Sequence, residues 1–296
     1  MMIVDMQQVM ISNLLAGLGG HTNTKLEPEL LRHMCLNSLR RYNVKFGNEY
    51  GELVIATDSR KNWRHDVFPY YKANRKKART ESELDWEMIF ETFNMVTSEL
   101  KEFFPFRVLN HPNAEADDII GSLCNKFGTT EFEFGYGGTK ILIISGDKDF
   151  RQLQKYENVK QYDPVRDRWL NEKDPALYLK EHIIRGDKGD GIVNILSPEN
   201  SMVLDVRQKS IYAKKLNIWL TQEPEEFCDS PEMLRRYKMN EALIDLSLIP
   251  DNIQEEIIEE FESQDGKTAK NLLAYFMKHR LKTLTESIGE FKNHKG

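Results

Sequence analysis

Short apolar runs alternate with longer stretches of mixed polarity along the first 173 residues of the chain. Four of these runs predict buried strands, at residues 2–4, 53–56, 106–109 and 140–145. The stretches between them predict helices at about residues 7–18, from Glu27 to a stop at Gly47, at 82–104, and from 115 onward. Because strands that alternate with helices form parallel sheets covered on both faces, the pattern predicts an α/β fold with a central, mostly parallel sheet.

The same pattern divides the chain into two parts. Residues 1–173 form the predicted core, which ends with a short helix after residue 147 and a hairpin around Asp163-Pro164. Residues 174–296 predict an α-helical C-terminal part. A glycine-rich stretch through Gly135, Gly137 and Gly138 predicts a loop, and it matches phosphate-binding motifs too poorly to be one of them.

Three of the predicted strands end on or beside an aspartate, namely Asp5, Asp58 and Asp147. Since the carboxyl ends of parallel strands meet at one edge of a sheet, we expect these side chains to lie close together. Each aspartate alone has a simpler explanation, as a helix N-cap or a turn residue. All three on the same edge predict a carboxylate cluster.

Further acids accompany these strand ends, in Glu115-Ala116-Asp117-Asp118 and in Asp147-Lys148-Asp149. Asp117 and Asp118 in the first turn of a helix are also explained by complementing the helix dipole. So many carboxylates in one place are costly unless cations or protons offset them. Oxygen ligands without thiol or imidazole select Mg²⁺ or Mn²⁺, so the acids predict a multi-metal carboxylate site.

The charge of the chain is unevenly distributed. The net charge is −6, but residues 60–79 hold eight Lys or Arg against the single acid Asp66, which gives this window +7. Its aromatic residues are Trp63, Phe68, Tyr70 and Tyr71. Basic side chains for phosphates and flat rings for bases are typical of a single-strand channel. The alternative is a solvated basic segment whose aromatic residues face inward.

Cysteine usage and hydropathy indicate the compartment. Cys35, Cys124 and Cys228 are odd in number and scattered, which argues against a disulfide framework or a cysteine zinc site and fits a reducing cytoplasm. Asp5 interrupts the first apolar run and no Lys or Arg precedes Lys25, unlike a secretory signal. No apolar run approaches membrane-spanning length.

The motifs, taken in order, resemble those of flap endonucleases and the 5′-nuclease domains of bacterial DNA polymerases. The resemblance runs from the first strand to about residue 190, and the C-terminal stretch from Leu246 together with the length is most similar to T-even-type phage members. The basic segment from Tyr71 to Arg75 resembles the family's Tyr-Lys-x-x-Arg element. The acidic elements are Asp5, Ile-Ala-Thr-Asp58, Glu115-Ala-Asp-Asp118, Ser145-Gly-Asp-Lys-Asp-Phe150 and Gly186-Asp-Lys-Gly-Asp190.

This resemblance implies a PIN-like 5′-nuclease core with a helical arch at about residues 60–80 and two bound Mg²⁺ ions, for which Mn²⁺ can substitute. The ligands that it implies are Asp5, Asp58, Glu115 and Asp117 around one ion with Asp118 nearby, and Asp147, Asp149, Asp187 and Asp190 around the second. Lys72 and Arg75 would steady the scissile phosphate, and Tyr71 would stack on a terminal base. Arg79, Lys76 and Lys77 would line the arch.

The implied activity is that of a Mg²⁺-dependent 5′ to 3′ exonuclease and flap endonuclease. It would act on RNA/DNA and DNA duplexes with 5′ ends, flaps or forks and remove RNA primers during DNA replication. The implied protein is a monomer in the cytoplasm, the host-cell cytoplasm if it comes from a phage. The sliding clamp and the single-strand-binding protein are the partners that the resemblance suggests.

One departure from the family pattern affects the C-terminal part. Family members usually continue with Asn-Ile-Pro-Gly-Val and a glycine-rich second hairpin turn, whereas this chain continues with Gly191-Ile-Val-Asn-Ile-Leu-Ser197. T-even-type members share this loss, which predicts a divergent helix–hairpin–helix element and leaves open whether it holds a monovalent ion. Three nearby lysines would contact duplex phosphates instead of the usual hairpin, or they form a solvated helix face. They are Lys209, Lys214 and Lys215.

Two other functions fit parts of the sequence. A phosphatase of the haloacid-dehalogenase type needs a second aspartate two residues after the first, but Asp5 is followed by Met6 and Gln7. A non-catalytic, structure-specific DNA-binding relative is expected to have lost metal ligands, yet all nine predicted acidic positions are filled.

Overall fold

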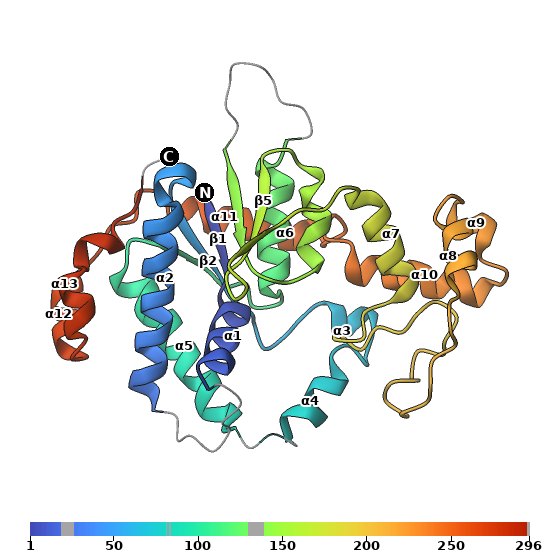
Figure 1. Ribbon diagram of the computed structural model, residues 1–296, viewed down its shortest axis with the longest axis horizontal. Coiled ribbons are helices and arrows are strands. Elements are labelled where there is room, and N and C mark those ends of the chain that lie inside the picture. Colours follow the sequence, from blue (N-terminus) through green and yellow to red (C-terminus); the bar gives the residue numbers. More distant parts are fainter. Residues whose placement is uncertain (19–26, 81, 83, 130–138, 295–296) are drawn as a thin grey trace.

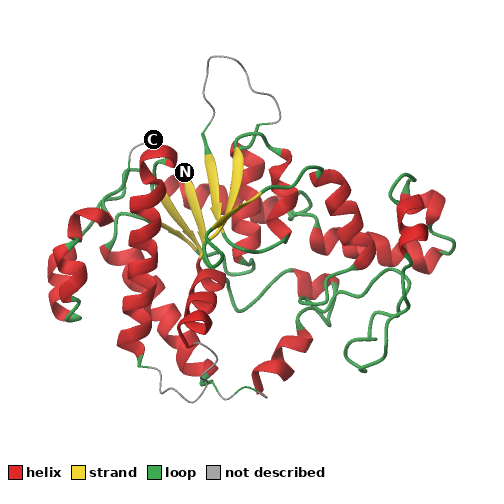
Figure 2. Cartoon of the chain, in the orientation of Figure 1, coloured by secondary structure: helices red, strands yellow, loops and turns green. Residues whose placement is uncertain are grey.

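The computed structural model describes residues 1–18, 27–80, 82, 84–129 and 139–294. A six-stranded sheet lies at its centre, in the order β3-β2-β1-β4-β5-β6 (Figures 1 and 2). β1 to β5 are parallel and β6 pairs antiparallel with β5. The strands are β1 (Met2–Asp5), β2 (Leu53–Ala56), β3 (Arg107–Leu109), β4 (Ile141–Ile144), β5 (Val159–Asp163) and β6 (Arg168–Leu170). The predicted mostly parallel sheet and the hairpin are confirmed.

Alternate side chains of the central strands are buried in two separate cores. Met2 and Val4 of β1 pack in the core on the side of α1 (Met6–Leu18), α2 (Pro28–Tyr50) and α5 (Trp86–Phe103). Ile3 packs on the opposite side, against α6 (Ala116–Phe127) and α11 (Asp251–Ser263). Because both faces are covered, the strands are continuous apolar runs rather than alternating ones.

Some helix boundaries differ from the sequence prediction. α2 continues through Gly47 to Tyr50 because Phe46 and Tyr50 are both buried in the core, so the predicted stop at Gly47 is wrong. The chain turns instead at Gly51, whose φ of 84° favours glycine. α5 begins later than predicted, after Asp85, whose side chain accepts a hydrogen bond from Met88 N at 3.0 Å. The glycine-rich loop prediction falls on residues 130–138, outside the described residues.

Between β2 and α5 the chain forms the predicted arch segment, with α3 (Arg64–Val67) and α4 (Ala73–Thr80). This segment and four helices further along the chain share a third core, which includes Phe68, Tyr71, Ile184, Trp219 and Tyr237. In Figure 1 these elements lie to the right of the sheet and below it. The four helices are α7 (Pro175–Arg185), α8 (Ala213–Trp219), α9 (Pro224–Phe227) and α10 (Pro231–Ile244).

The end of the chain returns to the sheet. Ile253 and Ile257 of α11 belong to the core beneath α6, while Phe276 and Phe291 belong to the core beneath α2. The last elements are α12 (Leu272–Lys278), α13 (Lys282–Glu286) and the 3₁₀ helix η2 (Ile288–Phe291). A second 3₁₀ helix, η1 (Asp149–Lys155), follows β4 and is the predicted short helix. The division at residue 174 stays a prediction. No helix in the described part of the chain is long and apolar enough to cross a membrane.

Candidate metal and nucleic-acid site

The carboxyl edge of the sheet gathers the strand-end aspartates. Asp5 is the last residue of β1, Asp58 follows β2 by two residues, and Asp147 follows β4 by three. The parallel register aligns these ends, with Asp5 beside Ala56 and Val4 beside Ile144. The three carboxylates therefore come from adjacent strands at one edge, as the sequence predicted.

Asp5 is buried at this edge. Its carboxylate accepts hydrogen bonds from Gln8 N at 3.1 Å and from Ser145 Oγ at 3.3 Å. Burial, with the negative charges of Asp58 and Asp147, raises the pKa of Asp5 to about 8. Burial also raises the pKa of Asp58, whose Oδ1 accepts a hydrogen bond from Ala116 N at 2.8 Å and so joins the end of β2 to α6.

The N-terminus of α6 brings Glu115 and Asp117 to the same edge. Glu115 accepts hydrogen bonds from Tyr71 Oη at 2.8 Å and from Lys72 Nζ at 2.7 Å. Burial and then the charge of Asp147 raise the pKa of Asp117 well above its ordinary value. The negative charge of Asp147 thus opposes the ionisation of both Asp5 and Asp117, and a bound cation would relieve this repulsion.

Asp118 makes contacts that the sequence did not predict. It is 0% exposed, and its carboxylate contacts the Arg64 guanidinium at 2.8 and 2.9 Å and accepts a hydrogen bond from Glu115 N at 2.8 Å. With these partners it forms a buried ion pair that fixes the start of α6. This pairing favours a structural role for Asp118, and its predicted role as a metal ligand stays a prediction.

A second group of acids lies beside the first. Asp149 N donates to Asp147 Oδ1 at 3.0 Å, at the turn into η1. Burial and the charges of Asp147, Asp187 and Asp190 raise the pKa of Asp149 well above its ordinary value. Asp187 and Asp190 come from the turn after α7. Asn240 holds this turn from α10, because its amide donates to the carbonyls of residues 183 and 193 at 3.0 and 2.8 Å.

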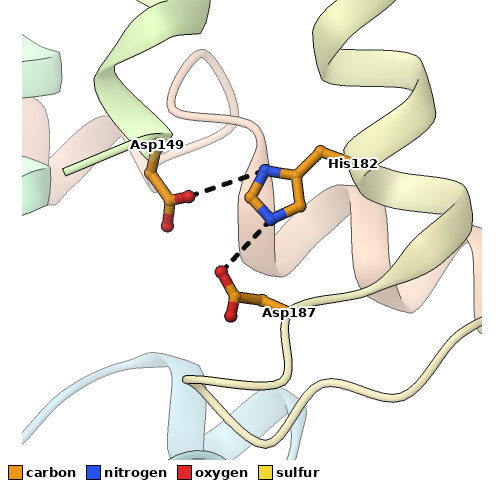
Figure 3. Close-up of side chains that lie close together, drawn as sticks. All are labelled: Asp149, His182 and Asp187. Carbon is orange, nitrogen blue, oxygen red and sulfur yellow. Dashed lines mark hydrogen bonds and ion pairs between the residues drawn. The ribbon is translucent and has the colours of Figure 1, made fainter.

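The structure also places a histidine in this group that the sequence analysis missed. His182 in the last turn of α7 lies between Asp149 and Asp187, with Nδ1 3.5 Å from Asp149 Oδ1 and Nε2 3.2 Å from Asp187 Oδ2 (Figure 3). One ligand atom from each of the three residues lies within 4.8 Å of the others. The position of His182 one helical turn before Gly186-Asp187 is the sequence signal that could have indicated its place in the site.

Asp187 is held on several sides. Its Oδ2 lies 2.8 Å from Lys148 Nζ, and its Oδ1 accepts a hydrogen bond from Gly189 N at 2.7 Å. Burial alone would raise the pKa of Asp187, but the hydrogen bonds from His182 and Lys148 outweigh it and hold that pKa well below its usual range. Gly186 permits the turn because its φ is 69° and a Cβ would lie 2.4 Å from the carbonyl oxygens of residues 192 and 193.

The base of the arch is joined to this turn. Lys72 N donates to Asp190 O at 2.7 Å, and Lys72 has a φ of 54°, in the left-handed region. Its Nζ lies between Glu115, at 2.7 Å, and Asp190, at 3.6 Å. Arg75 pairs with Asp190, and Tyr71 Oη lies 2.9 Å from the same carboxylate. The structure therefore brings Tyr71, Lys72 and Arg75 to the acids, as the motif predicted.

Tyr71 does not fit the stacking predicted for it, because its ring is 3% exposed within the third core. Trp63 and Phe68 are buried as well, so of the four aromatic residues of the window only Tyr70, at 40%, is well exposed. The inward-facing alternative is therefore correct for most of the aromatic residues. The side chains of Lys76 and Lys77 lie outside the described part of the chain, so their predicted contacts stay predictions.

A groove of about 950 Å³ runs from the acids along the arch. Its basic lining comes from Arg60, Lys72, Arg75 and Arg79. Trp86 and Phe90 of α5 also line it, and the Arg79 guanidinium lies 4.7 Å from the centre of the Phe90 ring. A channel with basic side chains and aromatic rings suits a single strand of nucleic acid, although its rings come from α5 rather than from the predicted window.

Comparison with known proteins gives the family of the chain. The model of the 5′-3′ exonuclease N-terminal resolvase-like domain matches residues 1–183, and that of the T4 RNase H C-terminal domain matches residues 174–291. This chain belongs to the 5′-3′ exonuclease family. It is a 5′-nuclease, and the predicted family membership is confirmed.

Individual relatives agree with this assignment. Ribonuclease H of Enterobacteria phage T4 is 34% identical over 299 residues, which are 98% of this chain and 95% of the phage protein. Flap endonuclease Xni of Yersinia enterocolitica is 30% identical over 45% of this chain and 49% of its own length. The bacteriophage T5 flap endonuclease, solved in a complex with DNA and metal ions, superposes with a TM-score of 0.60 at 16% identity, covering 89% of this chain and 98% of that one. That likeness confirms the predicted fold.

Proposed function

We propose that this 5′-nuclease uses two divalent ions to hydrolyse phosphodiester bonds at the 5′ ends of RNA or DNA strands in a duplex. It would act both as a 5′ to 3′ exonuclease and on flaps, and remove RNA primers during replication. The observation that supports this most is the meeting of two acidic groups at the edge of the sheet, beside a groove whose lining includes four basic side chains. The eight acids are Asp5, Asp58, Glu115, Asp117, Asp147, Asp149, Asp187 and Asp190.

The donor set fits divalent cations. Asp5, Asp58, Glu115 and Asp117 would hold one ion, and the four acids from Asp147 to Asp190 would hold the second, some of them through water. Two observations support this: the raised pKa values of the buried acids, which a bound cation would lower, and Asp149 Oδ1, which is buried without a hydrogen-bond partner. When bound, two divalent ions supply activation of water and charge stabilisation for an in-line displacement at phosphorus.

Charge explains the need for Lys72 and Arg75. Eight ionised carboxylates carry −8 and two divalent ions return +4, so the edge stays anionic and repels a phosphate. Lys72 and Arg75 now pair with Glu115 and Asp190, and burial of Lys72 beside these acids leaves its pKa raised above the ordinary value, because their charges outweigh desolvation. With the ions bound, both side chains would be released from part of this pairing and would steady the scissile phosphate.

The groove would guide the 5′ strand to the metals. Arg60 and Arg79 would contact phosphates, and Trp86 and Phe90 would stack on bases. Neither kind of contact depends on the base sequence of the strand. Lys76 and Lys77 would add to the basic lining of the arch. The C-terminal part would hold the duplex through Lys209, Lys214 and Lys215, all exposed. The chain lacks a regular second hairpin here, since residues 197–212 form turns and coil before α8.

We further propose that the protein acts as a monomer in the cytoplasm, which is the host-cell cytoplasm if it comes from a phage. It would contact the sliding clamp and the single-strand-binding protein, and its chain would divide into two parts near residue 174. A non-catalytic DNA-binding relative is not favoured, because all eight acids of the two groups are present. A phosphatase is not favoured, because two of these acids, Asp58 and Glu115, line the groove beside the arch.

Cleavage of two end-labelled substrates tests the proposal. A 5′-labelled DNA flap and an RNA/DNA duplex are incubated with Mg²⁺, with EDTA, and with Asp117→Asn as the site variant. Asp251→Asn is the matched control, because Asp251 is an exposed aspartate in the first turn of α11. We expect short 5′ products only with the divalent ion and only from the wild type and the control. Cleavage by Asp117→Asn at the wild-type rate would contradict the two-metal assignment.

A further inference from the structure

We propose that His182 is a direct ligand of the second divalent ion, and that this makes the site select Mn²⁺, Co²⁺ or Zn²⁺ over Mg²⁺. The inference rests on the proposed two-metal function and adds a nitrogen donor to a site predicted from carboxylates alone. One of the two metal positions would then have a nitrogen ligand, and the other would have oxygen ligands only.

The first support is a pair of buried atoms that face each other without a hydrogen bond. His182 is 7% exposed, and its Nδ1 has no hydrogen-bond partner. Asp149 Oδ1 has none either, and the two atoms lie 3.5 Å apart (Figure 3). A buried polar atom without a partner is costly, so the arrangement calls for a further group between the two.

Proton positions explain why that group is a cation. When His182 donates its Nε2 hydrogen to Asp187, Nδ1 is left with a lone pair directed at Asp149. His182 Nδ1 and Asp149 Oδ1 are then two hydrogen-bond acceptors that face and repel each other. A cation between them would attract both. Zinc–nitrogen and zinc–carboxylate bonds of about 2.1 Å at a tetrahedral angle separate their ligand atoms by roughly 3.4 Å, close to the separation observed.

The surroundings of His182 match those of metal-bound histidines. Such histidines usually donate their second ring N–H to a carboxylate, which fixes the ring and raises its basicity as a ligand. Asp187 is placed for this role at 3.2 Å and is itself fixed by Gly189 N. Lys148 Nζ lies 2.8 Å from Asp187 and 3.4 Å from His182 Nε2, and its half-exposed side chain can leave for solvent when an ion binds.

The donor set decides the selectivity. Mg²⁺ prefers oxygen ligands and gives up its waters reluctantly, whereas imidazole suits first-row transition ions. Asp149 Oδ1 with His182 Nδ1 therefore favours Mn²⁺, Co²⁺ or Zn²⁺ at this position. The other position, at Asp5, Asp58, Glu115 and Asp117, keeps the oxygen-only preference.

Pulsed EPR of Mn²⁺ bound to the untagged full-length protein, without nucleic acid, tests the inference. A directly bound imidazole gives ¹⁴N modulation of the Mn²⁺ signal. We expect it in the wild type, its loss in His182→Gln, and its retention in His111→Gln. His111 is the matched control, because it is a buried histidine whose Nε2 already pairs with Glu256 Oε2 at 2.7 Å.

Titrations of Mn²⁺ and Mg²⁺ give the affinities. His182→Gln should weaken Mn²⁺ binding at one position by about 10- to 100-fold and change Mg²⁺ binding much less. Absence of ¹⁴N modulation in the wild type would overturn the inference and leave His182 with a structural role between Asp149 and Asp187. This result does not depend on the folding of any variant. Modulation without strand cleavage would contradict the proposed nuclease function and not the histidine ligand.

Discussion

Replacement of Asp5 by asparagine is expected to stabilise the metal-free protein while abolishing its function. Asp5 sits at the end of β1 with its carboxylate buried beside Asp58 and Asp147. An amide of the same shape keeps an oxygen to accept the hydrogen bond from Gln8 N. Asp5→Asn therefore removes the charge and little else.

The pKa of Asp5 gives the size of the effect. It is about 8 in the folded protein against an ordinary value of 3.8. At 1.36 kcal/mol for each pH unit, that difference amounts to about 6 kcal/mol. Since the pKa of Asp5 is raised in the folded protein, protonation of Asp5 favours folding. This stabilisation is fully present below pH 3.8 and is lost as the pH rises through about 8. The figure is an upper limit, because neighbouring acids share the same protons.

Thermal melts in EDTA from pH 4 to pH 9 measure this effect. The melting temperature of Asp5→Asn should equal that of the wild type at low pH and exceed it by on the order of 10 °C at pH 8. Saturating Mg²⁺ should close the gap by stabilising the wild type alone. Asp163→Asn provides the contrast. Hydrogen bonds from Arg166 outweigh burial and lower the pKa of Asp163, so this variant should be destabilised above pH 4. An Asp5→Asn protein less stable than the wild type at pH 8 would refute the reasoning.

Three further changes test separate parts of the site. Asp149→Asn should abolish turnover and leave nucleic-acid affinity within a few-fold, as measured by a cleavage assay beside a binding titration at fixed salt, because the groove supplies the affinity. Lys72→Ala should slow single-turnover cleavage by about 100-fold or more at saturating enzyme, and an unchanged rate would limit Lys72 to binding. Arg64→Met leaves the Asp118 charge buried and unpaired, so urea unfolding should show a loss of about 3–5 kcal/mol, much of it recovered in the double variant with Asp118→Asn.

The sequence predicted the strand ends well and the contacts between distant segments poorly. Asp5, Asp58 and Asp147 were predictable because a parallel sheet brings strand ends to one edge whatever the loops do. The role of Asp118 was not, because Arg64 reaches it across 54 residues of chain and nothing local indicates the pairing.

Burial also determined the role of residues whose side chains can serve two purposes. Tyr71 carries a ring for either stacking or packing, and only the third core shows that it packs. The role of His182 likewise depends on its surroundings in the fold. A single histidine on a helix has no pattern of its own, and it became a candidate ligand only when the fold placed it between two carboxylates from separate elements.

The return of the chain end to the sheet has a consequence for synthesis. Ile257 and Phe291 complete the cores on opposite sides of the strands that carry the acids. While the ribosome tunnel still covers these two segments, both cores lack part of their side chains, so we expect the nascent chain to be protease-sensitive and inactive until residue 291 has emerged. Limited proteolysis of chains stalled before residue 246, compared with released protein, measures this. Nuclease activity would then begin only after the two cores that support the acidic edge are complete.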